Sequence, residues 1–374
     1  MKTNKLKPVF PLIFILSVFV NGANIRSLLP QRYELDQLLM VNAIGVDVYN
    51  DKEDKFRITL AYTEPDENVG VSTISASGVS FSAAINNAAS YSGRSIYLGQ
   101  SNMVIIGNEA AKNGLTELID YITRSYEARL NSVIITACGT AEEILNVKPI
   151  SGLDVLSELD TLIKNTSQNS LSYPSTLGEV IADFSDDNRY PVTPLIYTSS
   201  DENGGPVGNV LVGSAVYKDD ALYKTFTGEE AYIFTLLRNK SDSHTVVCDT
   251  DNAKRVTSQL IGSQINYDFT VNENGRINCA VNIILNATVI ETSSGLFNKN
   301  AANELMNNLK LHYEDVIMRF IDECIFDNED ILHIQDKLIK FHPVIYKYFS
   351  STDDIDFTVN VKISIENTTI YGGG

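Results

Sequence analysis

The stretch from Asn102 to Leu145 decides the fold class of this chain. It reads NMVIIGNEAAKNGLTELIDYIT over residues 102–123 and continues, after a polar segment, as SVIITACGTAEEIL over residues 132–145. The apolar runs NMVII and SVIITA predict strands, and each precedes a segment with helical spacing. Thr140 and Glu143 form an S/T-x-x-E pattern, which predicts a capped helix start. Strands that alternate with helices indicate an α/β or α+β layered domain.

Two further strands are predicted on the amino-terminal side. VNAIGVDV (residues 41–48) and the alternating FRITLAY (residues 56–62) resemble a hairpin, and residues 63–78 are expected to form a flexible loop. A helix is predicted over residues 80–92, with Ser80 as N-cap and Gly93 at its end.

The pattern of residues after Leu145 predicts helices first and then a strand-rich region. Residues 183–203 are rich in Asp, Asn, Ser and Pro, and DENGGP (Asp201 to Pro206) is the best linker candidate. The turn NENGR at residues 272–276 predicts a hairpin. The expected helices cover 154–165, 175–184, 229–237, 300–324 and 330–341, and the expected strands cover 209–217, 221–226, 243–248, 264–271, 277–289 and 355–365.

Composition and charge limit the class of protein. The chain has 374 residues, of which 44% are apolar and 20% are charged, as in ordinary globular proteins. This excludes a disordered chain, a collagen-like fibre and a multi-span membrane protein. The formal net charge of −18 disfavours binding to nucleic acid. It also disfavours contact with anionic lipid, so membrane association should need a dedicated anchor.

The amino terminus reads as an export signal. Residues 1–23 carry three lysines before a twelve-residue run, Val9 to Val20, that is apolar except for Pro11 and Ser17. This matches a signal peptide and is short for a membrane span, although an uncleaved anchor or a buried helix stays open. Cleavage after Gly22 would remove the three lysines and change the net charge from −18 to −21.

Motifs that carry known chemistry are missing from the sequence. No phosphate-binding glycine loop, zinc-protease motif or nucleophile elbow is present. The four cysteines contain no C-x-x-C; free thiols are favoured over disulfides, and Cys138 should be buried. We therefore predict no catalytic residue, no metal site and no cofactor. His333 and His342 straddle a helix end, and a packed or solvated role suits them better than metal binding. The acids of residues 327–336 suit the start of a helix.

Four runs, taken together and in this order, resemble the C subunit of bacterial spore germinant receptors, the Ger(x)C family. They are YELDQLLMVNAIGVDV (33–48), the block from Ser75 to Leu145, VGSAVYKDDALYKTFTGEEAYIFTLL (212–237) and DILHIQDKLIKFHP (330–343). The resemblance covers about residues 24–372. The matching positions that we single out are Gly78, Arg94, Tyr97, Leu98, Gly99, Gly107, Gly114, Arg124, Arg129, Gly213, Lys218, Asp330 and Pro343. We expect these residues to maintain the fold rather than to contact a ligand.

The resemblance implies an α+β fold with three mixed α/β domains, each a β-sheet flanked by helices. The expected units are an export signal or anchor (1–23), an N-terminal α/β domain (24–148), a middle helical or linker region (149–206) and a C-terminal β-rich α+β domain (207–372). It further implies a non-enzymatic receptor subunit on the outer face of the spore inner membrane. Its partners would be the A and B membrane subunits, and it would help to couple nutrient sensing to germination.

The sequence departs from the family pattern at two places. The signal normally ends in a lipobox cysteine that carries the lipid, but SVFVNGAN (17–24) contains no Cys. The chain is therefore lipoprotein-like without the acceptor thiol. His333 and Gln335 replace residues that are usually small, so the local turn should differ. The rival hypothesis is an exported solute-binding protein or hydrolase of the cell envelope, which would show a deep interlobe pocket or a convergent catalytic cleft.

Overall fold

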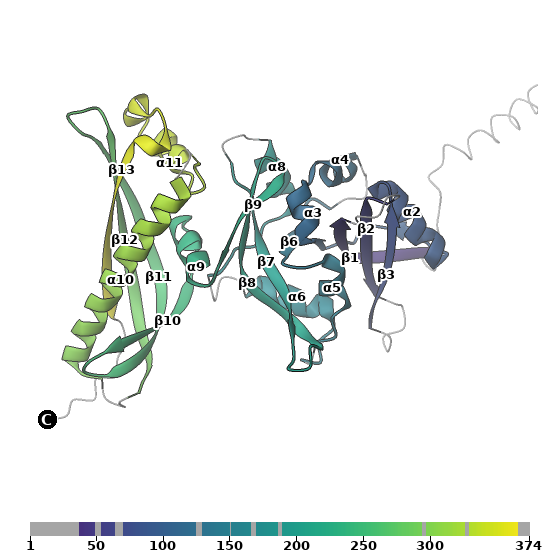
Figure 1. Ribbon diagram of the computed structural model, residues 1–374, viewed down its shortest axis with the longest axis horizontal. Coiled ribbons are helices and arrows are strands. Elements are labelled where there is room, and N and C mark those ends of the chain that lie inside the picture. Colours follow the sequence, from purple (N-terminus) through teal and green to yellow (C-terminus); the bar gives the residue numbers. More distant parts are fainter. Residues whose placement is uncertain are drawn as a thin grey trace, which may run out of the picture.

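The strands that the structure describes form two β-sheets, which lie beside each other along the long axis (Figure 1). The computed structural model describes residues 37–48, 54–63, 70–124, 129–149, 151–165, 170–185, 189–293, 297–325 and 329–365. The predicted export signal (1–23) lies outside these residues. Among the described residues, none of the helices combines the length and the apolar character needed to cross a bilayer.

The first sheet has parallel strands at its centre and antiparallel strands at both sides. Its order is β3-β2-β1-β5-β6-β7-β8-β9, and β4 pairs with β1. Parallel pairing joins β1 to β5, β5 to β6 and β6 to β7. The strands are β1 (Leu38–Val48), β2 (Phe56–Thr63), β3 (Val71–Gly78), β4 (Ser95–Tyr97), β5 (Met103–Ile106), β6 (Val133–Ala137), β7 (Val192–Ser200), β8 (Pro206–Lys218) and β9 (Ala221–Thr227).

Helices cover both faces of this sheet because its central strands are apolar on both sides. Val104 and Ile106 of β5 pack toward α2, α3, α4 and α8, whereas Met103 and Ile105 pack toward α5 and α6. The alternation of side chains along a strand thus divides one apolar run between two cores. The helices are α2 (Phe81–Ser92), α3 (Asn108–Asn113), α4 (Thr116–Arg124), α5 (Ala141–Asn146), α6 (Val155–Lys164) and α8 (Leu177–Phe184).

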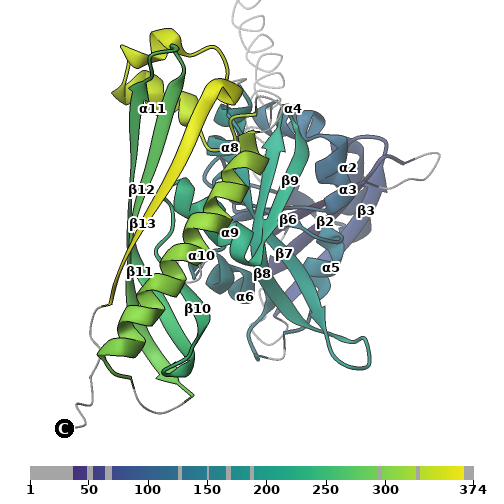
Figure 2. The same cartoon turned by 60° about the vertical axis from the view of Figure 1, so that its left-hand side comes forward.

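The second sheet has four strands in the order β10-β11-β12-β13 and is covered by one long helix. Helix α10 runs across a face of this sheet, as Figure 2 shows. Residues of α10, such as Leu305, Tyr313 and Phe320, share a core with β11 and β12. The elements are α9 (Gly228–Leu237), β10 (Ser243–Thr250), β11 (Lys254–Val271), β12 (Ile277–Thr292), α10 (Lys299–Ile325), α11 (Ile334–Phe341), the 3-10 turns η3 (Ile345–Tyr348) and η4 (Thr352–Asp354), and β13 (Ile355–Ile365).

The two sheets share one hydrophobic core at their junction. Val216 and Phe226 from the first sheet pack with Phe234 of α9 and Phe320 of α10. The Phe226 ring centroid lies 4.9 Å from that of Phe234 and 5.0 Å from that of Phe320. Helix α9 is buried on all sides from Ala231 to Leu237, which is why its sequence shows little amphipathic pattern.

The expected class, mixed α/β with sheets flanked by helices, is confirmed. The described residues contain two such sheets, because β7 of the middle region extends the first sheet instead of starting another. The prediction of a linker at Asp201–Pro206 is wrong: these residues turn the chain between β7 and β8, which pair antiparallel. The division of the chain into separate domains near residues 148 and 206 stays a prediction.

Three smaller predictions also need correction. Residues 71–78 form strand β3 instead of a loop, because β2 offers an open edge with which their backbone pairs. The segment with helical spacing after NMVII, predicted as one helix over residues 109–123, is two helices, since Gly114 has a φ of +96°. Cys138 is exposed at the end of β6 instead of buried. The four cysteines all carry free thiols.

Candidate functional site

The most enclosed charged contact in the first sheet joins β1 to the start of α5. Asp47 is 6% exposed, and its carboxylate accepts hydrogen bonds from the backbone N–H groups of Ala141 (2.8 Å) and Glu142 (3.0 Å). Burial raises the pKa of Asp47, although these two bonds oppose the shift. Beside it, Arg57 of β2 holds Glu142 through two bonds of 2.6 and 2.7 Å. The contact fixes the helix to the sheet.

Gly107 makes this contact possible. A Cβ at position 107 would overlap Oδ1 of Asp47 and lie 3.1 Å from its Cγ. The backbone N–H of Gly107 also donates to the carbonyl of Val46 over 2.8 Å. Position 107 therefore needs glycine because the buried carboxylate occupies the space of a side chain. Sequence analysis found Gly107 but missed Asp47, which the segment VNAIGVDV contains.

Three other predicted glycines also allow close approaches. A Cβ at Gly78 would lie 2.5 Å from the backbone nitrogen of Ala84 in α2, and one at Gly99 would lie 2.5 Å from the Tyr97 ring. Tyr97 and Gly99 thus pack as a pair, next to the buried Leu98. Gly114 leaves room for the Asp220 carboxylate, which caps Thr116 at the start of α4.

The three predicted arginines lie apart. Arg94 sits between α2 and β4, where its backbone N–H donates to the Ser92 hydroxyl over 3.2 Å. Arg124 pairs with Asp120 within α4 over 2.8 Å and is 78% exposed. Arg129 donates to the side-chain oxygens of Asn102 (2.9 Å) and Asn131 (3.3 Å). They do not form a common site.

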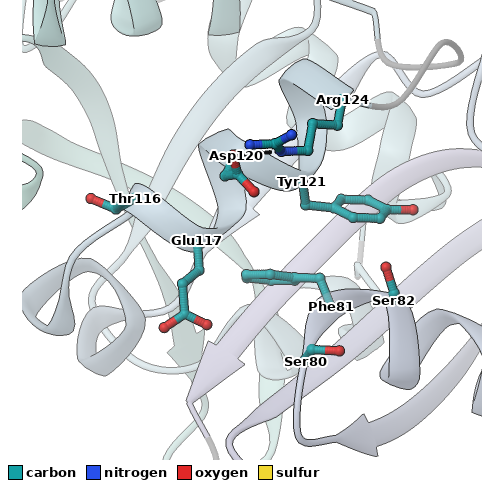
Figure 3. Close-up of a pocket in the computed structure, with 8 residues that line it drawn as sticks. All are labelled: Ser80, Phe81, Ser82, Thr116, Glu117, Asp120, Tyr121 and Arg124. Carbon is teal, nitrogen blue, oxygen red and sulfur yellow. Dashed lines mark hydrogen bonds and ion pairs between the residues drawn. The ribbon is translucent and has the colours of Figure 1, made fainter.

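A hollow of about 660 Å³ lies between the start of α2 and the length of α4. Figure 3 shows the rings of Phe81 and Tyr121 next to each other between the two helices, with Arg124 turned back toward Asp120. The ring centroids are 6.2 Å apart. The charged groups are paired with each other or, for Glu117, with Lys55. The lining residues are Ser80, Phe81, Ser82, Thr116, Glu117, Asp120, Tyr121 and Arg124.

This hollow does not assemble a catalytic constellation from its lining residues. Ser80 already accepts the N–H of Ala83 as the N-cap of α2, and no histidine lines the hollow that could activate Ser80 or Ser82. Elsewhere, the described residues contain no group of three His, Cys, Asp or Glu side chains that could hold a metal ion. The arrangement suits an open contact surface on which aromatic and charged side chains lie together.

A second site lies where the first sheet meets the segment before α11. Lys218, at the end of β8, pairs with Glu329, and the Tyr190 hydroxyl donates to the same carboxylate. The Glu329 side chain is only 12% exposed and that of Lys218 is 40% exposed, so the acceptor is the desolvated partner in this contact between distant parts of the chain. Hydrogen bonding to Glu329 raises the pKa of Lys218. The predicted residue Lys218 therefore links the first sheet to the segment before α11 by an ion pair.

Gly213 contributes to the junction between the two sheets by allowing β8 and β9 to approach closely. A Cβ at position 213 would overlap the backbone oxygen of Phe226, which precedes Thr227, the residue opposite Gly213 in the β8–β9 pair. Close pairing of these strands places Phe226 in the shared core.

Asp330 organises the start of α11. Its carboxylate accepts the N–H groups of Ile334 and Gln335, both over 2.7 Å. Burial raises the pKa of Asp330 to about 6. His333 adopts the left-handed conformation (φ 55°), which small residues adopt with less strain. Pro343 follows the end of α11 and is exposed.

Comparisons with known proteins bear on both halves of the chain. Residues 31–198 match the family model described as the spore germination protein N-terminal domain, and residues 212–369 match the one described as spore germination B3/GerAC like, C-terminal. YfkR of Bacillus subtilis (strain 168), a protein named for spore germination, is 27% identical over 225 residues. That match covers 59% of this chain and 57% of YfkR, so the chain spans little more than half of this relative.

One solved structure shows the same fold. The crystal structure of the GerBC protein superimposes with a TM-score of 0.57 over 87% of this chain and 97% of that chain. Sequence identity in this superposition is 15%, so the likeness concerns the arrangement of elements.

Proposed function

Because this chain belongs to the GerAC family of spore germination proteins, the germinant receptor C subunits, we propose that it acts as a non-enzymatic receptor subunit that couples nutrient sensing to germination. Its partners would be the A and B membrane subunits, and its place the outer face of the spore inner membrane. The proposal rests on the match of both halves of the chain to the two parts of this family.

The contacts made by the residues singled out from the sequence support a role in assembly. Gly107, Gly114 and Gly213 give room to buried or capping contacts, and Asp330 caps a helix. Lys218 links the halves through Glu329. A signal that displaces the first sheet would reach the part of the chain with the second sheet through the shared core and this ion pair.

Co-purification from spore membranes tests the assembly. A tagged chain should bring the A and B membrane subunits with it after mild detergent extraction. A tagged chain that extracts intact without any receptor subunit would contradict the proposal.

A deletion with complementation tests the coupling. Spores that lack the chain, and any paralogue, should lose the response to at least one nutrient, and the wild-type chain should restore it. Glu329→Gln should restore it only in part, whereas Glu291→Gln, an exposed change in β12, should restore it fully. Normal germination of the deletion strain with every nutrient would contradict the coupling role.

The rival hydrolase role has its own test. The purified chain should show no turnover on peptide, ester and glycoside panels. Activity that copurifies with the chain and responds to substitutions in the hollow of Figure 3 would favour the rival.

A further inference from the structure

The segment from α11 to η3 exposes an unusual amount of apolar surface. Ile339 is 47% exposed, Phe341 65%, Val344 69% and Tyr348 55%, all within ten residues of each other. Single exposed apolar side chains are ordinary on soluble proteins, but a concentration of them marks a contact surface. We call this surface, residues 339–348, the α11 edge.

The charge of the α11 edge is opposite to that of the chain. Lys340 and Lys347 are exposed, and no Asp or Glu occurs from Ile339 to Ser350. The whole chain carries −18. The local charge therefore differs in sign from the average, and the general argument that this chain avoids anionic surfaces fails here.

A cavity of about 450 Å³ opens beside the α11 edge. Its cationic groups are Arg189, Arg238, Lys337 and Lys340, against the single carboxylate of Asp336. His333, Asp336, Lys337 and Lys340 have the i, i+3, i+4, i+7 spacing of one helix face. Ile339 and Phe341 line the same cavity, so the cationic and the apolar groups form one continuous surface.

Several of these groups have partners within the protein, and Arg238 keeps donors for a ligand. Arg238 donates to the carbonyl of Ile331 (2.7 Å) and to the Tyr173 hydroxyl (3.2 Å), which uses two of its five N–H groups. Arg189 pairs with Asp183 over 2.9 Å. Lys337 donates to the carbonyl of Leu332, which leaves Lys340 as the exposed ammonium of the cavity.

His333 is a buried side chain beside the cations of the cavity. Its Nε2 atom is buried and has no hydrogen-bond partner among the described residues. Burial lowers the pKa of His333 to about 2, and the charges of Arg238, Lys337 and Arg189 act in the same direction. The ring is thus a neutral group among cations.

We propose that the α11 edge docks on an anionic phospholipid bilayer, with a headgroup phosphate in the cavity between Arg189, Arg238 and Lys340. Arginine and lysine bind phosphate oxygens through charge-assisted hydrogen bonds. Exposed Phe, Val and Tyr side chains enter the boundary between headgroups and acyl chains. A free anion would account for the cations but not for the apolar rim. The lipid surface matches both, and this docking does not depend on the receptor role.

Vesicle co-sedimentation of the full chain tests the docking. The probes are vesicles of phosphatidylcholine alone and of phosphatidylcholine with about one third phosphatidylglycerol. The expected result is tighter binding to the anionic vesicles, which weakens as salt is raised. Residues 1–23 are present in every variant, so their contribution to binding is common to all arms.

Two variants separate the apolar from the cationic contribution. Lys340→Ala with Lys347→Ala should reduce the preference for anionic vesicles about 30-fold, from the usual contribution of two lysines near an anionic surface. Phe341→Ala with Val344→Ala should reduce binding about tenfold or more, through lost apolar burial. All four side chains are exposed, so the fold should persist, as circular dichroism will show.

The matched control substitutions lie in helix α10 and strand β13, outside the α11 edge. Leu311→Ala on α10 removes a comparably exposed apolar group, and Lys310→Ala with Lys362→Ala removes two exposed lysines elsewhere. These changes should alter vesicle binding less than twofold. Equal losses in the controls and in the variants would show that overall charge alone drives binding and would overturn the proposal.

Two further outcomes would also overturn it. Binding of inorganic phosphate by calorimetry, without preference for anionic vesicles, would make the cavity a free-anion site. Variants that keep full vesicle binding but lose co-purified membrane subunits would make the α11 edge a protein interface.

Discussion

Substitution of Gly107 by alanine should disrupt the buried contact between β1 and α5. The added Cβ would overlap Oδ1 of Asp47, so the carboxylate must leave the N–H groups of Ala141 and Glu142. Hydrogen bonds to a charged group contribute about 1.5–3 kcal/mol each. Release of the buried charge to solvent offsets part of this, because burial disfavours the ionised form of Asp47. We expect a loss of about 3 kcal/mol in the free energy of unfolding.

A double-mutant cycle identifies the cause of this loss. Asp47→Ala alone should also cost about 3 kcal/mol, because it removes the same two bonds. With the carboxylate gone, the Cβ at position 107 has room, so the double variant should be about as stable as Asp47→Ala. The coupling would then be about 3 kcal/mol.

The measurement is urea unfolding followed by far-ultraviolet circular dichroism and tyrosine fluorescence, since the chain has 18 Tyr and no Trp. Gly93→Ala is the matched control: its φ is +65° and no atom lies within 4 Å of the added Cβ. It should cost only about 1–2 kcal/mol, from backbone strain. Additive losses for Gly107→Ala and Asp47→Ala would refute the proposed clash.

Three other predictions concern the junction and α11. Gly213→Ala should cost more than about 2 kcal/mol in urea unfolding, because its Cβ would overlap the backbone oxygen of Phe226; a loss near that of Gly93→Ala would count against the close approach. Glu329→Ala should cost about 2–3 kcal/mol, since two donors lose their acceptor, whereas Lys218→Ala should cost about 1 kcal/mol or less; the reverse order would contradict the desolvated acceptor. Because the folded pKa of Asp330 is raised to about 6, its contribution to stability is full below about pH 4 and is lost as the pH rises through 6; the unfolding free energy of wild type minus that of Asp330→Asn should fall by about 2 kcal/mol between pH 4 and 7, and a flat difference would refute the raised pKa.

Several elements follow from local sequence pattern. The alternation in residues 56–62 predicts β2, the Asn-Gly turn at residues 272–276 predicts the β11–β12 hairpin, and the Thr140–Glu143 pattern predicts the capping box of α5. These signals are local because a strand period, a turn and a cap each depend on a few neighbouring residues. The glycine positions were selected from the resemblance to the family, and the reasons for them came only from the structure.

The elements that sequence analysis missed depend on distant partners. Strand β3 has a polar, small-residue sequence, and its strand conformation depends on pairing with β2. The run at Asp201–Pro206 has the composition of a linker, but the strands that flank it pair with each other. Local composition therefore predicted flexibility where long-range hydrogen bonds impose order.

The amino-acid sequence by itself determined the mixed α/β class, most helix and strand positions, the acidic charge and the resemblance to the receptor subunits. Only the tertiary structure decided that Asp47 fills the space left by Gly107, that Lys218 meets Glu329, and that Arg189 joins the cations of α11. The physical reason is distance along the chain: 60 residues separate Asp47 from Gly107, and 111 separate Lys218 from Glu329. Burial and charge at such sites are set by the residues that folding brings together.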